Sequence, residues 1–132
     1  MYTKIIKLYY GDTYTTETIE TINTVIHHSL ENCFKIPADD TFQLWVPMTQ
    51  KNNFVDDCYL LAGGQRNKQF IYIEIFCGPG RTISQKKALY QTIAEQIDLK
   101  TSLTKENIFI LLNEVPLENW SFGDGKAQMI QE

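Results

Sequence analysis

The chain has 132 residues, of which 43% are hydrophobic, 12% aromatic and 21% charged, and its formal net charge is −4. This composition is typical of one folded domain with a proper hydrophobic core and excludes a disordered chain. The acidic balance, without a cluster of Lys and Arg, argues against a nucleic-acid partner, and the apolar runs are too short to cross a membrane.

Apolar residues alternate or recur at helical spacing along most of the chain, and turn residues separate these runs. We expect Pro47 to end the second strand, because proline cannot donate a ladder hydrogen bond. A long polar connection at 48–69 should be functional or partly structured, as connections of that length usually are. The expected elements are a strand at 4–10, a helix at 15–34, strands at 41–46 and 70–77, a helix at 82–98 and a strand at 107–112.

Cysteines and histidines show no pattern typical of a metal site. Cys33, Cys58 and Cys77 are odd in number and widely spaced, so we expect reduced, mostly packed thiols. His27 and His28 lie on adjacent faces of the first helix, so they cannot share one metal, and we expect both near the surface. The N-terminus has no signal-peptide pattern, from which we expect a cytoplasmic protein.

The two halves of the chain follow one pattern at a constant offset. Gly11 aligns with Gly78 and Thr15 with Thr82, and both pairs differ by 67 positions without a gap. We therefore predict a single domain over residues 1–132 that contains an internal duplication. Its pseudo-repeats are about 1–47 and 68–114, followed by a C-terminal tail at 115–132.

Each repeat reads as strand, crossover helix, strand, which should form a right-handed parallel pair. The predicted fold class is therefore α+β: two tandem β-α-β units make a four-stranded mixed sheet with two helices on one face. The aliphatic face of the sheet should meet the helices. The opposite face is either solvated or used for self-association, and its aromatic content favours self-association. That face carries Lys7, Tyr9, Tyr72, Glu74 and Phe76.

Three motifs join this duplicated pattern. They are Ile36-Pro-Ala-Asp-Asp-Thr-Phe-Gln43, Gly80-Arg81-Thr82 followed by Gln85-Lys86, and Asn119-Trp-Ser-Phe-Gly123 followed by Ala127-Gln128. With them, nearly the whole chain resembles the tautomerase superfamily, especially the long-chain subgroup that contains malonate semialdehyde decarboxylase. The resemblance implies a homotrimer with pockets near the subunit boundaries. It also implies small 2-oxo acids, enols or related carboxylates as ligands, with no metal and no organic cofactor.

The resemblance implies chemistry at an amino-terminal proline, whereas this chain begins Met1-Tyr2-Thr3. Tyr2 therefore stands at the matching position. It is a candidate substrate-binding residue or, alternatively, a core or interface aromatic. If Met1 is retained, its α-amine, with an unperturbed pKa of about 7.7–8.0, lies one residue away and could act as a base only if the chain bends it into the pocket.

Arg81 matches the carboxylate-binding arginine of the family and would polarise a bound substrate. Alternatively, it pairs with Asp12 or with a carboxylate of the tail. The decarboxylase has a second arginine in this loop, and its place is taken here by the sequence Gly78-Pro79-Gly80, which speaks against decarboxylation. Thr82 and Gln85 are expected to form a capping box that starts the second helix.

Asp40 matches the water-activating carboxylate of the decarboxylase, and the alternative is that it caps a turn together with Asp39. Trp120 and Phe122 match the apolar wall of the pocket, and Met129 falls where an aromatic residue completes that wall. Alternatively, these side chains close the core or pack the trimer.

Two functions follow from the resemblance. One is an isomerase of the tautomerase type that acts on a small 2-oxo acid or enol, with Arg81 as the anchor and with Asp40, the Met1 amine or water as the base. The other is a catalytically inactive relative that binds a small carboxylate. A purely structural trimer is a third reading.

Overall fold

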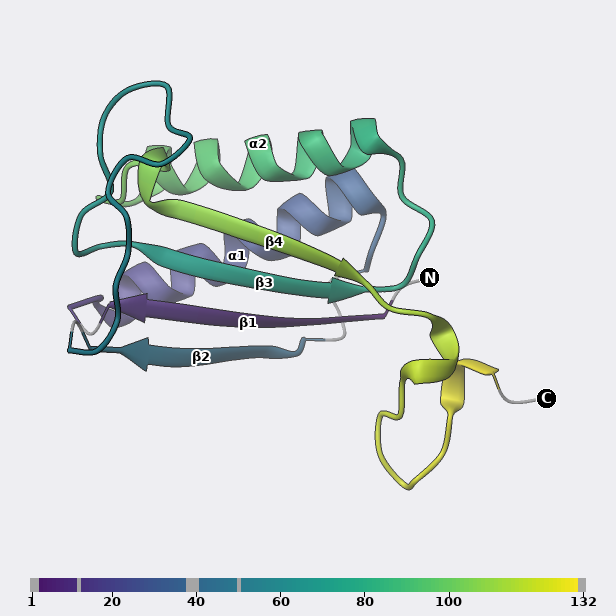
Figure 1. Cartoon of the computed structure of the whole chain (residues 1–132). Coiled ribbons are helices and arrows are strands. Elements are labelled where there is room, and N and C mark those ends of the chain that lie inside the picture. The colour runs from purple at the N-terminus through teal and green to yellow at the C-terminus, as the bar shows by residue number, and fades with distance from the viewer. Residues whose placement is uncertain (1–2, 12, 38–40, 50, 131–132) are drawn as a thin grey trace.

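The computed structural model of the chain describes residues 3–11, 13–37, 41–49 and 51–130. Four strands form one sheet in the order β2-β1-β3-β4, and both helices lie on the same side of it (Figure 1). This mixed sheet with helices on one face confirms the predicted fold class. The elements are β1 (Lys4–Gly11), α1 (Thr16–Phe34), β2 (Gln43–Met48), β3 (Ile71–Cys77), α2 (Ile83–Lys100) and β4 (Ile108–Glu114).

Alternation along the two central strands creates the core. In β1 the side chains of Ile6 and Leu8 are fully buried, and in β3 those of Ile73 and Ile75 are too. Their neighbours along each strand point to the other face, because successive side chains of a strand alternate. The buried stripes of α1 and α2 pack against this aliphatic face, as the helical spacing of the sequence predicts.

Both helices begin on a threonine cap. The Thr15 Oγ1 accepts from the N–H of Thr18, and the Thr82 Oγ1 accepts from the N–H of Gln85. Only the second cap is a complete box, because the Gln85 side chain also accepts from the N–H of Thr82. The predicted capping box is confirmed.

Strand pairing relates the two units by an internal two-fold axis. Ile6 of β1 pairs with Gln43 of β2, and Ile73 of β3 pairs with Ile110 of β4, so both partners are displaced by 73 − 6 = 67 positions. Between the units, Lys7 pairs with Glu74, which is its own counterpart at that offset. The axis therefore passes between these two residues. An internal duplication predicts equal registers in the two units. The duplication itself stays a prediction.

The predicted end of the second strand is wrong. β2 runs through Pro47 to Met48, and Pro47 pairs with Tyr10 of β1. β2 is an edge strand with β1 as its one neighbour, so a residue without an N–H can be accommodated there. His27 also differs from expectation: it is buried with Nε2 3.4 Å from the Thr41 hydroxyl, whereas His28 is exposed.

The sheet face away from the helices is aromatic and apolar. Tyr9 and Tyr72 stack at 5.6 Å between ring centroids, and Phe109 meets Tyr72 edge-on at 5.5 Å. Burial, followed by the contact with Glu74, raises the pKa of Tyr72 to about 12, so its phenol stays protonated and donates to that carboxylate. Leu44, Val46, Phe109 and Leu111 remain exposed on this face. Within the described part of the chain, neither helix is long and apolar enough to cross a membrane.

Candidate functional site

Several segments distant in sequence meet at the end of the sheet where β1 begins. Lys4 of β1 pairs with Cys77 at the end of β3, and the carbonyl of Cys77 accepts from the N–H of Val115 just after β4. The Lys4 side chain is buried and donates to the carbonyl of Pro37, beyond the end of α1. Figure 1 shows the tail after β4 projecting beyond the sheet at this same end. The turn with Arg81 and the aromatic tail are thus brought to one side of the molecule.

Glu114 fixes the turn between β3 and α2. One carboxylate oxygen accepts from the N–H groups of Gly80 (3.0 Å) and Arg81 (3.3 Å), and the other accepts from the Lys86 ammonium at 2.7 Å. The hydrogen bond from Lys86, ahead of those from the two amides, lowers the pKa of Glu114 below its usual value. Gly80 has φ +113°, a conformation that a side chain would strain. This turn is therefore tightly specified.

Arg81 turns its side chain back toward the end of α1. Its Nη1 donates to the carbonyl of Gly78 and its Nη2 to the carbonyl of Phe34, each at 3.1 Å. The guanidinium also lies over the Phe34 ring, 5.1 Å from the centroid. The Glu114 carboxylate accepts from the main-chain N–H of Arg81. The guanidinium is held instead by the two carbonyl oxygens and the Phe34 ring. The result is a half-buried cation held in one orientation.

The tail contributes the aromatic residues predicted for a pocket wall. Trp120 and Phe122 stack with centroids 5.5 Å apart and planes 10° from parallel, and the Trp120 indole donates to the carbonyl of Val115. Phe122 also faces Phe42, just before β2, at 6.4 Å. Met129 lies in a short 3-10 turn and is half-buried. Phe122 is still 41% exposed, so this wall is open on one side.

Two predicted site residues, Tyr2 and Asp40, lie outside the described residues. Their proposed roles therefore stay predictions. For the other four, the backbone path brings Arg81, Trp120, Phe122 and Met129 to the end of the sheet where β1 begins.

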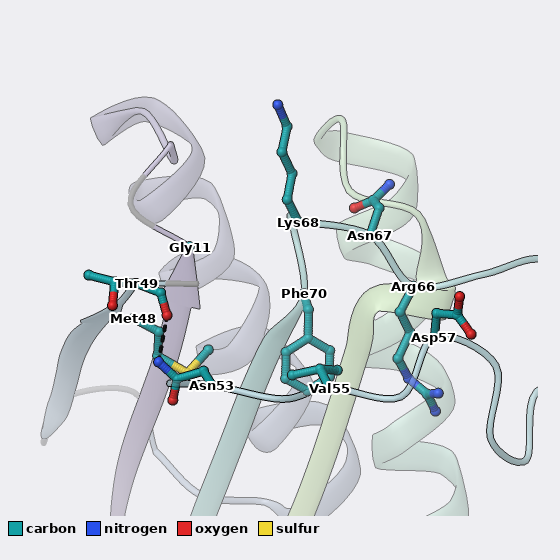
Figure 2. Close-up of a pocket in the computed structure, with 10 residues that line it drawn as sticks. All are labelled: Gly11, Met48, Thr49, Asn53, Val55, Asp57, Arg66, Asn67, Lys68 and Phe70. Carbon is teal, nitrogen blue, oxygen red and sulfur yellow. Dashed lines mark hydrogen bonds between the residues drawn. The ribbon is translucent and has the colours of Figure 1, made fainter. Parts of the chain in front are cut away.

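A cavity of about 330 Å³ lies at the opposite end of the sheet, where β1 and β2 finish and β3 begins (Figure 2). In Figure 2, the lining residues Val55 and Phe70 lie between Arg66 on one side and Asn53 on the other. The sequence marked the 48–69 connection only by its length. No motif pointed to these residues, because the cavity forms from three stretches that are separate in sequence: Gly11, residues 48–57 and residues 66–70.

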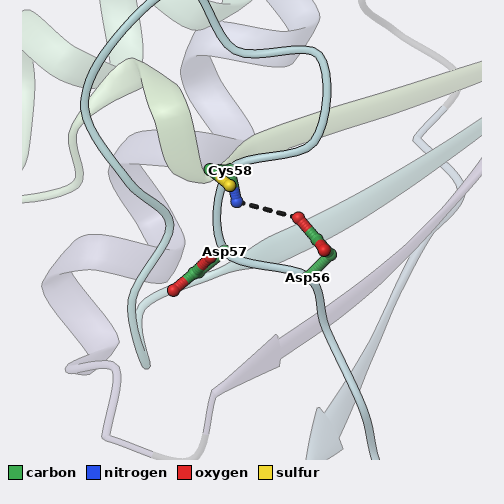
Figure 3. Close-up of side chains that lie close together, drawn as sticks. All are labelled: Asp56, Asp57 and Cys58. Carbon is green, nitrogen blue, oxygen red and sulfur yellow. Dashed lines mark hydrogen bonds between the residues drawn. The ribbon is translucent and has the colours of Figure 1, made fainter.

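Ligand-type side chains also gather at Asp56, Asp57 and Cys58, whose ligand atoms lie within 4.8 Å of one another (Figure 3). The Asp56 carboxylate accepts from the N–H groups of Cys58 and Tyr59, and these bonds lower the pKa of Asp56. A hydrogen bond to Asp57, ahead of the nearby acidic charges, raises the pKa of the Cys58 thiol. Metals bind the thiolate. These exposed side chains are thus accounted for as a hydrogen-bonded turn of the connection.

Comparisons with known proteins identify the family and the relatives that this chain resembles. A family model described as a tautomerase enzyme matches residues 40–123. The probable tautomerase YusQ of Bacillus subtilis (strain 168) is 37% identical over 113 residues, which are 86% of this chain and 87% of that protein.

Solved structures agree with the sequence relatives. The FG41 malonate semialdehyde decarboxylase inhibited by 3-bromopropiolate superposes with a TM-score of 0.81 at 28% identity, over 94% of this chain and 92% of that one. A symmetric trimer of fused 4-OT has a TM-score of 0.74 at 10% identity, covering 95% of this chain and 96% of that chain, and shows the same fold.

Proposed function

This chain belongs to the tautomerase family, and from that premise we propose that it binds a small 2-oxo acid or enol carboxylate and catalyses its keto-enol tautomerisation. The observation that carries the proposal is the position of Arg81. A guanidinium held by two carbonyl oxygens and a ring stands at the end of the sheet that also carries the stacked aromatic tail. The inhibitor bound by the related decarboxylase, 3-bromopropiolate, is itself a small carboxylate.

Arg81 would anchor the substrate carboxylate and stabilise the negative charge that develops on the enolate oxygen. Preorganised donors do this well, because they need not reorient during the reaction. The N–H groups of Gly80 and Arg81 already bind Glu114, so the guanidinium and not the main chain of this turn would receive the substrate. Trp120 and Phe122 would cover the apolar part of the substrate.

The base is proposed to be Asp40, the Met1 amine or a bound water, because Tyr2 stands where the resemblance places a proline. A phenol with an unperturbed pKa of about 10 is a poor base at neutral pH. Intact-mass measurement of the purified protein identifies the amino-terminal residue. A chain that retains Met1 keeps its amine as a candidate, and a chain that begins at Tyr2 replaces it with the Tyr2 amine.

The test is ketonisation of phenylpyruvate enol by the wild type, Arg81→Ala and Lys87→Ala. Lys87 is exposed on the first turns of α2, so its variant controls for the loss of one positive charge in the same region. Removing a preorganised donor usually lowers kcat by about 10²–10³. We expect a loss of that size for Arg81→Ala and none for Lys87→Ala, and equal rates for all three proteins would overturn the role of Arg81.

A second candidate, a catalytically inactive carboxylate-binding protein, is favoured by Tyr2 at the proline position. Thermal shift with phenylpyruvate separates the two. Stabilisation without turnover, lost in Arg81→Ala, supports the inactive binder. If the protein shows neither turnover nor stabilisation, the purely structural trimer is the remaining interpretation.

The proposed assembly is a homotrimer built through the aromatic sheet face. The exposed Leu44, Val46, Phe109 and Leu111 form an apolar band around the Lys7–Glu74 pair, which suits burial against other copies. The fused 4-OT of the same fold is a trimer. We expect light scattering to give three times the 15.3 kDa chain mass, and Phe109→Lys to give smaller species. A wild-type monomer would contradict the assembly.

A further inference from the structure

The cavity at the far end of the sheet has the size and preorganisation of a small-molecule site. Its volume of about 330 Å³ is within the usual range for such sites. Three apolar side chains, Met48, Val55 and Phe70, line it together with polar groups from the connection (Figure 2).

The internal two-fold axis maps this cavity onto the candidate site. With the offset of 67 positions given by the strand registers, Gly11 corresponds to Gly78 at the start of the turn that carries Arg81. The cavity is therefore the place where a second, equivalent site would lie in a symmetric molecule.

The walls of this cavity are held in place by hydrogen bonds. Arg66 donates through Nη1 to the carbonyl of Asp56 (3.1 Å) and through Nη2 to that of Tyr59 (2.9 Å), and its own N–H reaches the carbonyl of Asp57. At the end of β1, Gly11 approaches Lys68 so closely that a Cβ on Gly11 would lie 2.8 Å from the Lys68 carbonyl oxygen. The connection thus forms a built wall rather than a loose loop.

Charge selects the class of ligand. The guanidinium of Arg66 is oriented by neutral carbonyl oxygens, and it also lies close enough to the Asp56 carboxylate to help lower the pKa of that group. That carboxylate itself accepts from the N–H groups of Cys58 and Tyr59. Asp57 lies beside Arg66 in Figure 2, and Lys68 points away from the other lining side chains, where it adds a positive charge at the rim. Two cationic residues and one carboxylate line the cavity, beside an apolar centre.

We propose that this cavity is a second ligand site, distinct from the Arg81 end, which binds a small monocarboxylate with an apolar body. The carboxylate is received at the Arg66 side, where a guanidinium matches its geometry. The apolar body lies against Val55 and Phe70. This proposal does not depend on turnover at Arg81.

The test follows backbone amide signals by NMR during titration with benzoate, and in parallel with benzyl alcohol and benzylamine. These probes share an aromatic body and differ in charge. We expect benzoate to shift the amides of Val55, Asn67 and Phe70 saturably, with a Kd at least tenfold lower than that of benzyl alcohol. Equal affinities, tighter binding of benzylamine, or no shift at these amides would overturn the proposal.

A steric variant and its control complete the test. Val55→Trp fills the cavity at a position that is 47% exposed, so the fold should tolerate it, and Val55→Ile changes the volume little. The benzoate response should be lost in the first variant and kept in the second. A response retained in a folded Val55→Trp would overturn the site.

The amides of Gly80 and Trp120 report the Arg81 end separately. Arg81→Ala should leave the benzoate response of Val55 and Phe70 intact, even if the protein has no tautomerase activity. Failure of the proposed function is thereby distinguished from failure of this site.

Discussion

The turn between β3 and α2 and its counterpart between β1 and α1 have the same place in two equivalent units, but they carry different side chains. Arg81 in the second unit corresponds to Tyr14 in the first. The Tyr14 hydroxyl donates to the carbonyl of Gln69, and burial raises the pKa of this phenol well above its usual value. One turn thus presents a fixed cation and the other a neutral, structural hydrogen bond.

The continuations of the two units differ as well. β4 ends in Glu114, which fixes its turn, whereas the corresponding position in β2 is Pro47. After β4 comes an aromatic tail that projects from the sheet, and after β2 a connection that folds back to form a cavity (Figure 1, Figure 2). Strands, helices and register agree between the units, while the loops and their side chains do not.

The largest effect is expected in the core, where both units should respond alike. Ile6→Ala and Ile73→Ala each remove a fully buried side chain at equivalent positions, and each should lower the free energy of unfolding by about 2–5 kcal/mol. Urea unfolding at one fixed protein concentration measures both. Ile83→Ala, at a position that is 74% exposed, serves as the control and should change little. A large loss for one core variant alone would contradict the equivalence of the two units.

A smaller effect should distinguish the first turn through its close contact with the connection. Gly11→Ala places a Cβ 2.8 Å from the Lys68 carbonyl, and the resulting backbone shift should lower stability by about 1–3 kcal/mol. Gly63→Ala meets no atom within 4 Å and is the matched control. Thermal unfolding compares the two, and an unchanged Tm for Gly11→Ala would mean that the contact is readily relieved.

Helix caps provide a finer comparison. Thr15→Ala and Thr82→Ala should each destabilise the protein by about 1 kcal/mol, because each removes the acceptor for an N–H of the first turn. Thr82→Ala should have the larger effect, since loss of its Oγ1 acceptor also loosens the reciprocal bond that the Thr82 N–H donates to Gln85. When Gln85→Ala is combined with each of these two substitutions, the difference in destabilisation between Thr82→Ala and Thr15→Ala should become smaller. If Thr15→Ala proves the more damaging variant, the complete box gives no extra stability.

The smallest effect is expected in the stability of the protein at acidic pH, which should depend on Glu114. The equivalent position in the first unit, Pro47, has no group that titrates. The pKa of Glu114 is lowered in the folded state, so its contribution is present above the ordinary value of 4.5 and is lost as the pH falls through the folded value. The Tm advantage of the wild type over Glu114→Gln should therefore be constant at neutral pH and shrink below pH 4.5. A difference that persists unchanged to strongly acidic pH would point to another cause.

The sequence alone determined the strands except for the end of β2, both helices, the capping box of α2 and the equivalence of the two halves. These features depend on residues near one another in the chain: alternation in Ile71–Cys77, apolar spacing along the helices, and the Thr82–Gln85 box. The sequence also placed Arg81 in its turn and Trp120 in the tail, because motifs are local.

Tertiary structure decided the remainder. Pro47 is tolerated within β2 only because that strand lies at the edge of the sheet, which its own sequence does not reveal. The orientation of Arg81 depends on the carbonyl of Phe34, 47 positions away in the chain. The cavity beside Phe70 likewise needs the ends of β1 and β2 and both ends of the connection at once. Local patterns fix the elements, but the direction of a charged side chain and the walls of a cavity depend on which distant segments come into contact.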